Sequence, residues 1–304
     1  MSGKYLLSIV GPTAIGKTKL AMDLATYFNT EIISADSRQF YKEMSIGTAV
    51  PSKHELESVP HHFIQHKSIQ EKYNVGDFEK DALNVLDNLF EKYDIAIMVG
   101  GSGLFIDAVI SGLDSFPEVD REIRTKLNTV IKQEGIEVIQ NQLKELDAEY
   151  YAKVDIQNPH RITRALEICL GTGKTYSSFI NKKKPPRPFN SIVIGLSTER
   201  SRLYDKINKR VDTMIESGLI EEARSLSKHK HLNALRTVGY TELFNYFDGI
   251  WDLDFAISEI KKNTRRFSKR QLTWFGKNKD IIWFDVSTPF DEILNKIMQL
   301  KKVM

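Results

Sequence analysis

The sequence predicts an α/β protein in which helices cover a parallel sheet and a smaller, all-helical domain is inserted. Three observations support this fold class. Short apolar segments alternate with amphipathic segments early in the chain, and a glycine-rich turn follows the first apolar segment. A stretch without any strand pattern then interrupts the alternation before it resumes. Alternating strands and helices are typical of parallel sheets with both faces buried.

The first part of the chain shows the alternation most clearly. Residues 4–10 predict a buried strand, a glycine-rich turn and a helix over 17–28 follow, and residues 31–35 predict a second strand. The segment 76–93 carries apolar residues at helical spacing, and 95–99 predicts another all-apolar strand. Strands without polar alternation are expected in the interior of a sheet.

The alternation is interrupted in the middle of the chain, between Pro117 and Pro188. No strand pattern occurs there, and the segment ends in KKKPPRP, whose charge and proline content are typical of a linker. The sheet pattern then resumes with a strand over 191–197, helices over 201–275 and a last strand over 281–286. The predicted parts are a core over 1–116 plus 188–304 and a helical insertion over 117–187.

The composition is that of an ordinary globular protein: 41% of the 304 residues are hydrophobic and the formal net charge is +3. No run of about 18 apolar residues occurs, so we expect no membrane span. The first apolar segment is too short for a signal peptide. The single cysteine, Cys169, excludes an internal disulfide framework and a cysteine-based zinc site. We therefore expect a cytoplasmic protein.

Basic residues gather in two places, one in a predicted helix and one in the linker. Such clusters suit a phosphate backbone, although a solvated helix face has the same composition. The helix cluster, which contains no acid, comprises Lys261, Lys262, Arg265, Arg266, Lys269 and Arg270, and the linker cluster comprises Lys182, Lys183, Lys184 and Arg187.

Residues 11–18, GPTAIGKT, match the phosphate-loop pattern G-x-x-x-x-G-K-[ST] between a predicted strand and a predicted helix. Glycines let the backbone N–H groups turn toward a phosphate, and the helix N-terminus adds a positive dipole end. The pattern predicts a P-loop fold and a phosphate or diphosphate site, with the Thr18 hydroxyl placed for Mg²⁺. The predicted phosphate-binding residues are Gly11, Thr13, Ala14, Ile15, Gly16, Lys17 and Thr18.

A phosphate loop does not identify a reaction. ATP- and GTP-hydrolysing proteins usually place an aspartate at the end of a neighbouring strand to hold magnesium. Here the strand 95–99 ends in Gly100-Gly101-Ser102-Gly103, without a carboxylate. The strand 31–35 does end in one, Asp36, but Ser37-Arg38-Gln39 follows at once. This arrangement suits an organic acceptor as much as a metal, and it weakens the nucleotide hydrolase interpretation without excluding it.

Several longer blocks follow the phosphate loop in order: ISADSRQFY at 33–41, SIGTAVP at 45–51, VPHHF at 59–63, GGSGLF at 100–105, NPHRITRALEICLGTGK at 158–174, RTVGY at 236–240 and KRQLTWF at 269–275. Together with GPTAIGKT, these blocks resemble one known family, the tRNA dimethylallyltransferases (tRNA isopentenyltransferases, the IPP transferase family), in their bacterial type. GPTAIGKT looks like that family's phosphate loop. Departures are small: Ser102 stands where the family usually has Thr but keeps the hydroxyl, and Phe40 and Phe105 replace aliphatic or tyrosine variants.

The resemblance implies a reaction and its partners. The family transfers a dimethylallyl group from dimethylallyl diphosphate to N6 of the adenosine 3′ to the anticodon of tRNA, with Mg²⁺ as cofactor. The diphosphate would lie in the phosphate loop, and the adenosine would leave its stack. The helical insertion would contact the anticodon stem-loop. We expect no membrane partner and a monomer.

Catalysis must overcome the weak nucleophilicity of an exocyclic adenine amine, and a carboxylate that accepts its proton would help. Asp36 is the candidate, because it follows a predicted parallel strand at the edge where α/β sheets bind ligands. The alternative is an aspartate that only caps a helix. Fixed donors would also stabilise the leaving diphosphate. The candidates for this role are Lys17, Thr13, Thr18 with Mg²⁺, Ser102 and Arg236. For Arg236 the alternative interpretation is an arginine on a surface loop without a role in the site.

The helix predicted over 253–275 carries an apolar stripe expected to face the core, formed by Leu253, Ala256, Ile257, Ile260, Phe267 and Trp274. Gln271 falls inside this stripe, where it either bonds core backbone or faces a substrate channel. The resemblance favours the channel for Gln271 and Thr273. The tRNA-binding residues that it implies are Asp36, Ser37, Arg38, Gln39, His160, Arg161, Arg164, Arg236, Gly239, Tyr240, Lys269, Arg270, Gln271, Thr273 and Trp274.

Three other functions stay open at this point. A small-molecule kinase would use ATP at the same loop and need no RNA. An isopentenyltransferase acting on free adenine nucleotides resembles the same family, and a nucleotide-gated RNA-binding module would not need Asp36. The insertion and the basic helix favour a large acceptor. His61 and His62 do not indicate a metal site, since no carboxylate or cysteine lies at ligand spacing.

Overall fold

A computed structural model describes residues 3–180, 182 and 184–303, so Lys183 of the linker cluster lies outside the described residues. The described core contains one six-stranded sheet in the order β3-β2-β4-β1-β5-β6, in which every pair of neighbours is parallel. The predicted parallel sheet is therefore confirmed. Its strands are β1 (Tyr5–Val10), β2 (Ile32–Ser34), β3 (His61–His62), β4 (Ile95–Val99), β5 (Asn190–Ser197) and β6 (Ile282–Asp285).

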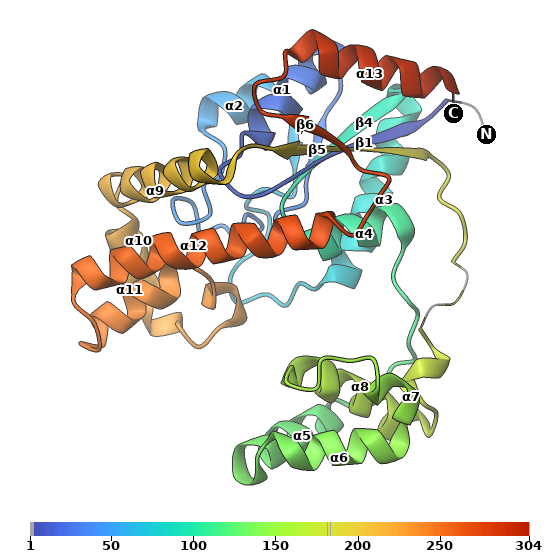
Figure 1. Cartoon of the computed structure of the whole chain (residues 1–304), viewed down its shortest axis with the longest axis vertical. Helices are drawn as coiled ribbons and strands as arrows, with labels where there is room; N and C mark the ends of the chain where they lie inside the picture. The colour runs from blue at the N-terminus through green and yellow to red at the C-terminus, as the bar shows by residue number, and fades with distance from the viewer. Residues whose placement is uncertain (1–2, 181, 183, 304) are drawn as a thin grey trace. The chain divides into compact units, whose positions relative to one another are not determined.

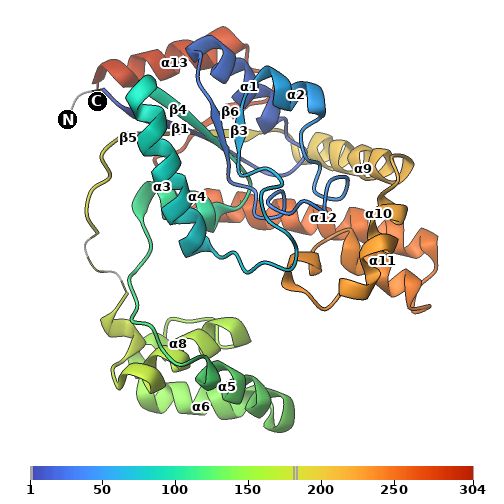
Figure 2. The ribbon, with the colours of Figure 1, turned by 180° about the vertical axis from the view of Figure 1, so that it is seen from behind.

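Helices cover both faces of this sheet (Figures 1 and 2). β1 shows why, because Leu6 and Val10 belong to the apolar core on one face and Leu7 and Ile9 to the core on the other. One face packs against α1 (Lys17–Phe28), α13 (Phe290–Val303) and the first half of α9 (Arg200–Glu216). The other packs against α3 (Val75–Lys92), α4 (Gly103–Ser111), α10 (Leu219–Leu226), α11 (Tyr240–Phe247) and α12 (Leu253–Phe275).

The helical region predicted over 201–275 is several helices in the structure. Gly218, with φ 98°, precedes α10, and Gly239, also with φ 98°, precedes α11. Residues with a side chain rarely adopt a positive φ. Glycine at these two positions therefore lets the chain change direction between consecutive helices. The short elements of the core are α2 (Lys53–Ser58), η2 (Ser227–His229) and η3 (Asn233–Leu235).

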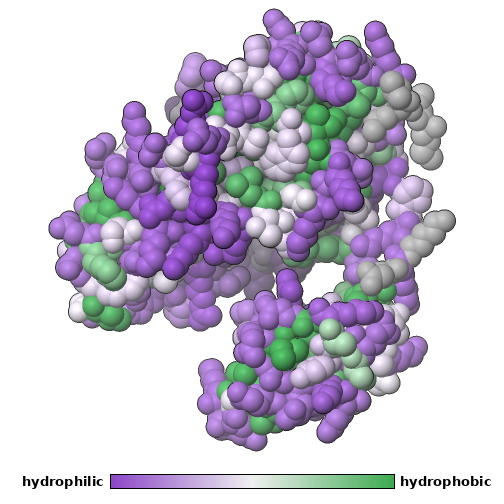
Figure 3. All heavy atoms as spheres, viewed as in Figure 1, coloured by the Kyte–Doolittle hydropathy of each residue, from purple (hydrophilic) through white to green (hydrophobic). Residues whose placement is uncertain are grey.

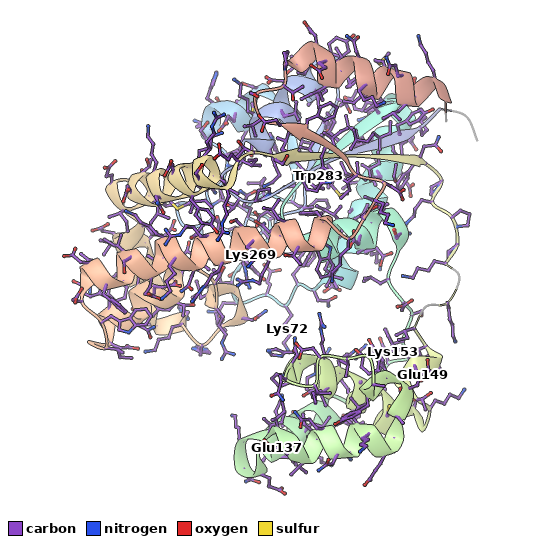
Figure 4. All side chains as sticks on the ribbon, in the orientation of Figure 1. Lys72, Glu137, Glu149, Lys153, Lys269 and Trp283 are labelled. Atoms are coloured by element: carbon purple, nitrogen blue, oxygen red, sulfur yellow. The ribbon has the colours of Figure 1, made fainter. Side chains whose placement is uncertain are left out.

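The chain divides into two compact units: residues to Ser111 together with those from Arg187 form the core unit, and Gly112–Pro186 form the insertion unit. The insertion unit has its own apolar centre, which includes Leu127, Ile139 and Leu166. A surface ion pair one helical turn apart, Glu149 with Lys153 at 2.8 Å, is labelled in Figure 4. The helices of this unit are α5 (Arg121–Glu134), α6 (Ile136–Leu146), α7 (Ala148–Tyr151), α8 (Pro159–Thr172) and η1 (Tyr176–Ser178).

Two residues of the linker cluster, Lys184 and Arg187, are bonded within the fold. Arg187 donates hydrogen bonds to the carbonyls of Ala108 and Val109 at the end of α4 and pairs with Glu79. Within the insertion unit, Lys184 donates to the carbonyl of Gly112 at 2.7 Å. Cations suit the carbonyl end of a helix because of its negative dipole end. No helix in the described ranges is long and apolar enough to cross a membrane.

Candidate active site

The phosphate loop lies between β1 and α1, as the sequence predicts. Gly11 has φ 143°, and a Cβ there would come within 2.7 Å of the Leu196 carbonyl oxygen on β5. Gly16, with φ 110°, is the N-cap of α1 and lets the loop enter the helix. The residues from Thr13 to Thr18 line a cavity of about 770 Å³, the phosphate cavity, at the carboxyl ends of the strands.

Lys17 is the cation of this loop. Its ammonium group donates a hydrogen bond to the Pro12 carbonyl at 2.7 Å. Burial lowers its pKa to about 7, the nearby Asp36 carboxylate opposes this shift, and the Arg210 guanidinium adds to it. A bound anion would restore the charge of Lys17, so the loop is prepared for a phosphate ligand.

A second cavity, of about 670 Å³, adjoins the phosphate cavity and is lined by Ser37, Ser102 and Arg236 among others. Asp36 belongs to the walls of both. It follows β2, and its carboxylate accepts a hydrogen bond from the Arg38 backbone N–H at 3.0 Å. The residues common to both cavities are Thr13, Asp36, Arg210, Met214, Phe267 and Gln271.

Arg210 is a site residue that the sequence analysis missed. It lies on α9, and burial lowers its pKa while the Asp36 carboxylate opposes the shift. The helix pattern gives no local signal for it, because Arg210 comes seven residues after the buried Leu203 and so lies on nearly the same side of α9. The polar residues of α9 that line the phosphate cavity are Lys206, Lys209, Arg210 and Thr213, and Ser217, which follows the helix, lines it too.

Gln271 connects two loops of the site. Its side-chain oxygen accepts from the Thr13 backbone N–H at 2.8 Å, and its nitrogen donates to the Gly101 carbonyl at 3.0 Å. Of the two roles considered, the structure shows bonding to core backbone, by a side chain that is 6% exposed and also lines both cavities. Gln271 therefore joins the phosphate loop to the glycine-rich loop after β4.

The glycine-rich loop carries Ser102, whose hydroxyl donates to the Ser37 hydroxyl and accepts from the Ser37 backbone N–H, both at 3.1 Å. Ser102 therefore lines the second cavity with Ser37 as its hydrogen-bond partner.

Trp274 donates to Asp107 of α4 at 2.8 Å, and burial raises the pKa of Asp107 even though this hydrogen bond opposes the shift.

The expected core stripe of α12 was wrong at two positions. Phe267 and Trp274 are 39% and 38% exposed, and both line the second cavity. The residues that pack inward from the second half of the helix are Ser268, Gln271 and Phe275. The reason is that the face of α12 that carries Ile260, Phe267 and Trp274 borders the second cavity as well as the core.

Three residues expected at the RNA surface have their side chains engaged inside the core unit. Tyr240 is fully buried and donates to Glu222 at 2.6 Å, so its contact with RNA is corrected to a structural role. Arg38 donates to the carbonyls of Asn233 and Ala234 in the segment before Arg236. Gln39 donates to the carbonyls of Thr48 and Ala49. Gly239 borders the second cavity, and its N–H donates to Glu242.

The basic cluster of α12 is divided between structural and exposed cations. Lys261 pairs with Asp212, Lys262 pairs with Glu259, and Arg265 donates to Asn208. Arg266, Lys269 and Arg270 are exposed and make no ion pair within the described residues. Figure 4 places Lys269 in the second half of α12, and the surface over α9 and α12 is mostly hydrophilic in Figure 3. Thr273 is exposed, and its hydroxyl bonds the Lys269 carbonyl.

In the insertion unit, His160 and Arg161 are exposed at the start of α8. Arg164 is half-buried and donates to Glu167, which also accepts two hydrogen bonds from Arg124. Burial alone would raise the pKa of Glu167, but these guanidinium groups outweigh it and hold the pKa below its usual value. The apolar side of this helix, which includes Ile162, Leu166 and Cys169, is buried.

The neighbouring histidines have separate partners. His61 Nδ1 bonds the Val59 carbonyl at 2.7 Å, and His62 Nε2 bonds Glu31 at 2.7 Å. No group of three His, Cys, Asp or Glu side chains in the described part of the chain is arranged to hold a metal ion. The hydroxyl-bearing residues of the phosphate loop that line the cavity are Thr13 and Thr18.

A family model described as IPP transferase matches residues 39–279. The chain belongs to the IPP transferase family. This membership makes it a transferase, and it confirms the resemblance seen in the sequence blocks. The match begins at Gln39, after β2, ends at Lys279, just beyond α12, and includes the insertion unit.

Curated relatives and solved structures agree with the family. The chain is 62% identical over 288 residues to the tRNA dimethylallyltransferase of Christiangramia forsetii, covering 95% of this chain and 94% of that protein. It is 56% identical to the Flavobacterium johnsoniae protein of the same name, with 97% and 98% covered. The structure resembles a Bacillus halodurans tRNA isopentenylpyrophosphate transferase (TM-score 0.71, 38% identity, 99% and 95% covered). It also resembles a eukaryotic dimethylallyltransferase acting on tRNA (TM-score 0.81, 27% identity, 93% and 74% covered).

Proposed function

We propose that this protein transfers the dimethylallyl group of dimethylallyl diphosphate to N6 of the adenosine 3′ to the anticodon of tRNA. One observation carries the proposal: Asp36 lies on the wall shared by the phosphate cavity and the second cavity. A donor held by the phosphate loop and an acceptor base in the second cavity would meet at this carboxylate. The names of the relatives, tRNA dimethylallyltransferases, agree with this pairing of donor and acceptor.

The acceptor half of the reaction uses Asp36. The N6 lone pair is delocalised into the purine ring, and it becomes available as the Asp36 carboxylate accepts the N6 proton. The nitrogen then bonds the allylic carbon while the carbon–oxygen bond to the diphosphate breaks. Ser37 and Ser102 line the second cavity and supply hydroxyls at the base, and Phe267 and Trp274 provide aromatic faces there.

The donor half places negative charge on the leaving diphosphate. Lys17, Arg210 and the backbone N–H groups of the loop face the phosphate cavity and stabilise this charge in the transition state more than in the ground state. Thr18 would hold Mg²⁺ together with the diphosphate oxygens, which fits a cation that binds few protein ligands beside substrate phosphates. When bound, Mg²⁺ neutralises charge on the diphosphate.

The RNA would be bound by charge and by shape. Arg266, Lys269 and Arg270 on α12 are the exposed cations of the core unit closest in sequence to Gln271, and His160 and Arg161 are the exposed basic residues of α8. Phosphate contacts of this kind fix the position of an RNA without reading its sequence. We include Arg236 in the second cavity as a contact to the substrate.

The decisive experiment measures transfer of radiolabelled dimethylallyl from its diphosphate to unmodified total tRNA, with and without Mg²⁺. AMP serves as the alternative acceptor, and ATP consumption is followed in parallel. We expect label on tRNA alone. Label on AMP would assign the protein to free-nucleotide chemistry. Transfer of the ATP phosphate without any prenyl transfer would replace the proposal with a kinase.

A further inference from the structure

The segment Ser45–Pro51 forms a wall of the phosphate cavity, and its polar backbone is bonded from two sides. Glu222 of α10 accepts hydrogen bonds from three successive N–H groups, those of Ser45, Ile46 and Gly47, at 2.8–2.9 Å. The same carboxylate accepts the Tyr240 hydroxyl at 2.6 Å. Four donors on one carboxylate hold this turn of the wall in a single conformation.

The other end of the wall is held through its carbonyls. Gln39 donates to the carbonyl oxygens of Thr48 and Ala49 at 3.1 and 2.9 Å. Ala49 has φ 49°, a left-handed conformation that is unfavourable for a residue with a side chain. Bonds from Gln39 to this position stabilise that conformation. With Glu222 on its N–H groups and Gln39 on its carbonyls, the wall is preorganised.

Of the five residues of this wall that line the phosphate cavity, all except Ser45 are apolar. Ile46, Ala49, Val50 and Pro51 line the same cavity as the phosphate loop, and Met214 of α9 adds to its apolar lining. Phosphates need the opposite surroundings, namely the cations and N–H groups of the loop. The apolar wall therefore matches the hydrocarbon part of a prenyl diphosphate.

From this geometry we propose that Ser45–Pro51 is the prenyl-binding wall, and that Glu222 is the positioning residue that sets how long a prenyl chain the site accepts. The inference rests on the proposed function and deepens it by assigning donor specificity. Glu222 touches neither reactant; it acts by fixing the backbone that carries Ile46. Close packing of Gly47 against the Tyr240 ring, where any Cβ would clash, adds to the rigidity of the wall.

Rigidity matters here because a short hydrocarbon offers little binding energy for discrimination. An extra methylene in an apolar pocket changes discrimination by only about 10–200-fold. A wall that cannot move converts the same added carbons into a steric clash. We therefore expect a strong preference for the five-carbon donor over a ten-carbon one, dependent on Glu222.

The test compares dimethylallyl and geranyl diphosphates as donors to unmodified tRNA, using the ratio of their kcat/KM values. Glu222→Gln removes acceptor capacity and directs an amide N–H₂ at backbone donors. This variant should raise KM for dimethylallyl diphosphate and leave KM for tRNA unchanged. It should reduce the preference for dimethylallyl over geranyl diphosphate about 10-fold. Ile46→Ala, which enlarges the pocket directly, should reduce the preference as well. Glu221→Gln, one residue earlier and exposed on α10, is the matched control and should keep the wild-type ratio.

An unchanged ratio in both Glu222→Gln and Ile46→Ala would overturn the proposal. Because Ile46→Ala acts on the wall itself, the test does not depend on the folding of the Glu222 variant. If wild-type protein transfers neither donor to tRNA, the proposed function fails, and equilibrium binding of the two diphosphates to the same variants decides the wall separately. If the Glu222→Gln and Ile46→Ala variants lost affinity equally for both diphosphates, the assignment of Ser45–Pro51 as the prenyl-binding wall would be contradicted.

Discussion

The Gln271 side-chain oxygen accepts a hydrogen bond from the Thr13 N–H at 2.8 Å, although 258 residues separate them. Its nitrogen reaches the Gly101 carbonyl, so one amide holds two substrate loops. Gln271→Met should leave both backbone groups without their partner and cost about 1–3 kcal/mol of unfolding free energy. It should also raise KM for the donor, because Thr13 belongs to the phosphate loop.

Chemical denaturation and donor kinetics measure both effects of the Gln271 change. Gln299→Met, at an exposed position on α13, makes the same substitution without a loop contact and should match wild type. A Gln271→Met protein with wild-type stability and wild-type donor KM would show that the two loops do not depend on this amide.

Asp36→Asn should abolish most turnover while preserving the fold. Asparagine keeps an oxygen that can accept the Arg38 N–H bond, but it cannot take the amine proton at neutral pH. We expect kcat to fall by about 10²–10⁴, with tRNA affinity unchanged. Single-turnover transfer and filter binding check the two parts, and exposed Asp23→Asn on α1 is the control. Retention of wild-type kcat would exclude Asp36 as the base.

The lowered pKa of Lys17 predicts that anion binding depends on pH. Its pKa in the free protein is lowered to about 7, and a bound diphosphate raises it again. Affinity for pyrophosphate is therefore greatest below about pH 7 and declines as pH rises between the free and the bound pKa, by up to about tenfold per pH unit. Calorimetric titration from pH 6 to 9 measures this slope.

The Lys17→Met variant separates the contribution of this lysine from the titration of pyrophosphate itself. Its affinity should be weak and should retain only the slope that the ligand imposes. Parallel slopes for wild type and Lys17→Met would mean that the ammonium group does not change its protonation on binding.

The exposed cations of α12 should carry the salt dependence of tRNA binding. Arg266→Ala combined with Lys269→Ala removes two charges that make no ion pair among the described residues. The slope of log affinity against log salt should fall by about 1.4–1.8, the contribution of two phosphate contacts. Lys261→Ala with Lys262→Ala removes the same charge from residues paired with Asp212 and Glu259 and should change the slope less. Equal slopes in all three proteins would exclude the α12 surface from RNA binding.

Substitutions of two arginines of α8 should have different effects, one on the free energy of unfolding and the other on tRNA affinity. Arg164 is bonded to the buried Glu167, so Arg164→Ala should lower the unfolding free energy by about 1–3 kcal/mol. Because the folded pKa of Glu167 is lowered, that stability is present above its unfolded pKa and is lost as pH falls through the folded value. Arg161→Ala, at an exposed position, should weaken tRNA binding without changing stability. Thermal melts and filter binding compare the variants, and a destabilised Arg161→Ala would reverse the assignment.

Local patterns predicted much of this molecule, and residues that depend on tertiary packing escaped them. The phosphate loop and the strands around it follow from glycine spacing and apolar runs, which act over a few residues. Arg210 and Glu222 could not be found this way, because their helices meet the site only after the fold is complete. The helical pattern predicts that Phe267 and Trp274 face the core, because an apolar side chain on a helix gives the same sequence pattern whether it packs in a core or lines a cavity.

The placement of β1 has a consequence for how the protein is made on the ribosome. β1 is the fourth strand across the sheet and pairs with β4 and β5, so one of its edges waits for residues 190–197. The insertion unit, with its own apolar centre, emerges during that wait. Gln271 comes later still. The first motif to be translated is thus among the last to reach its final shape, and a nascent chain exposes an open strand edge until late in synthesis.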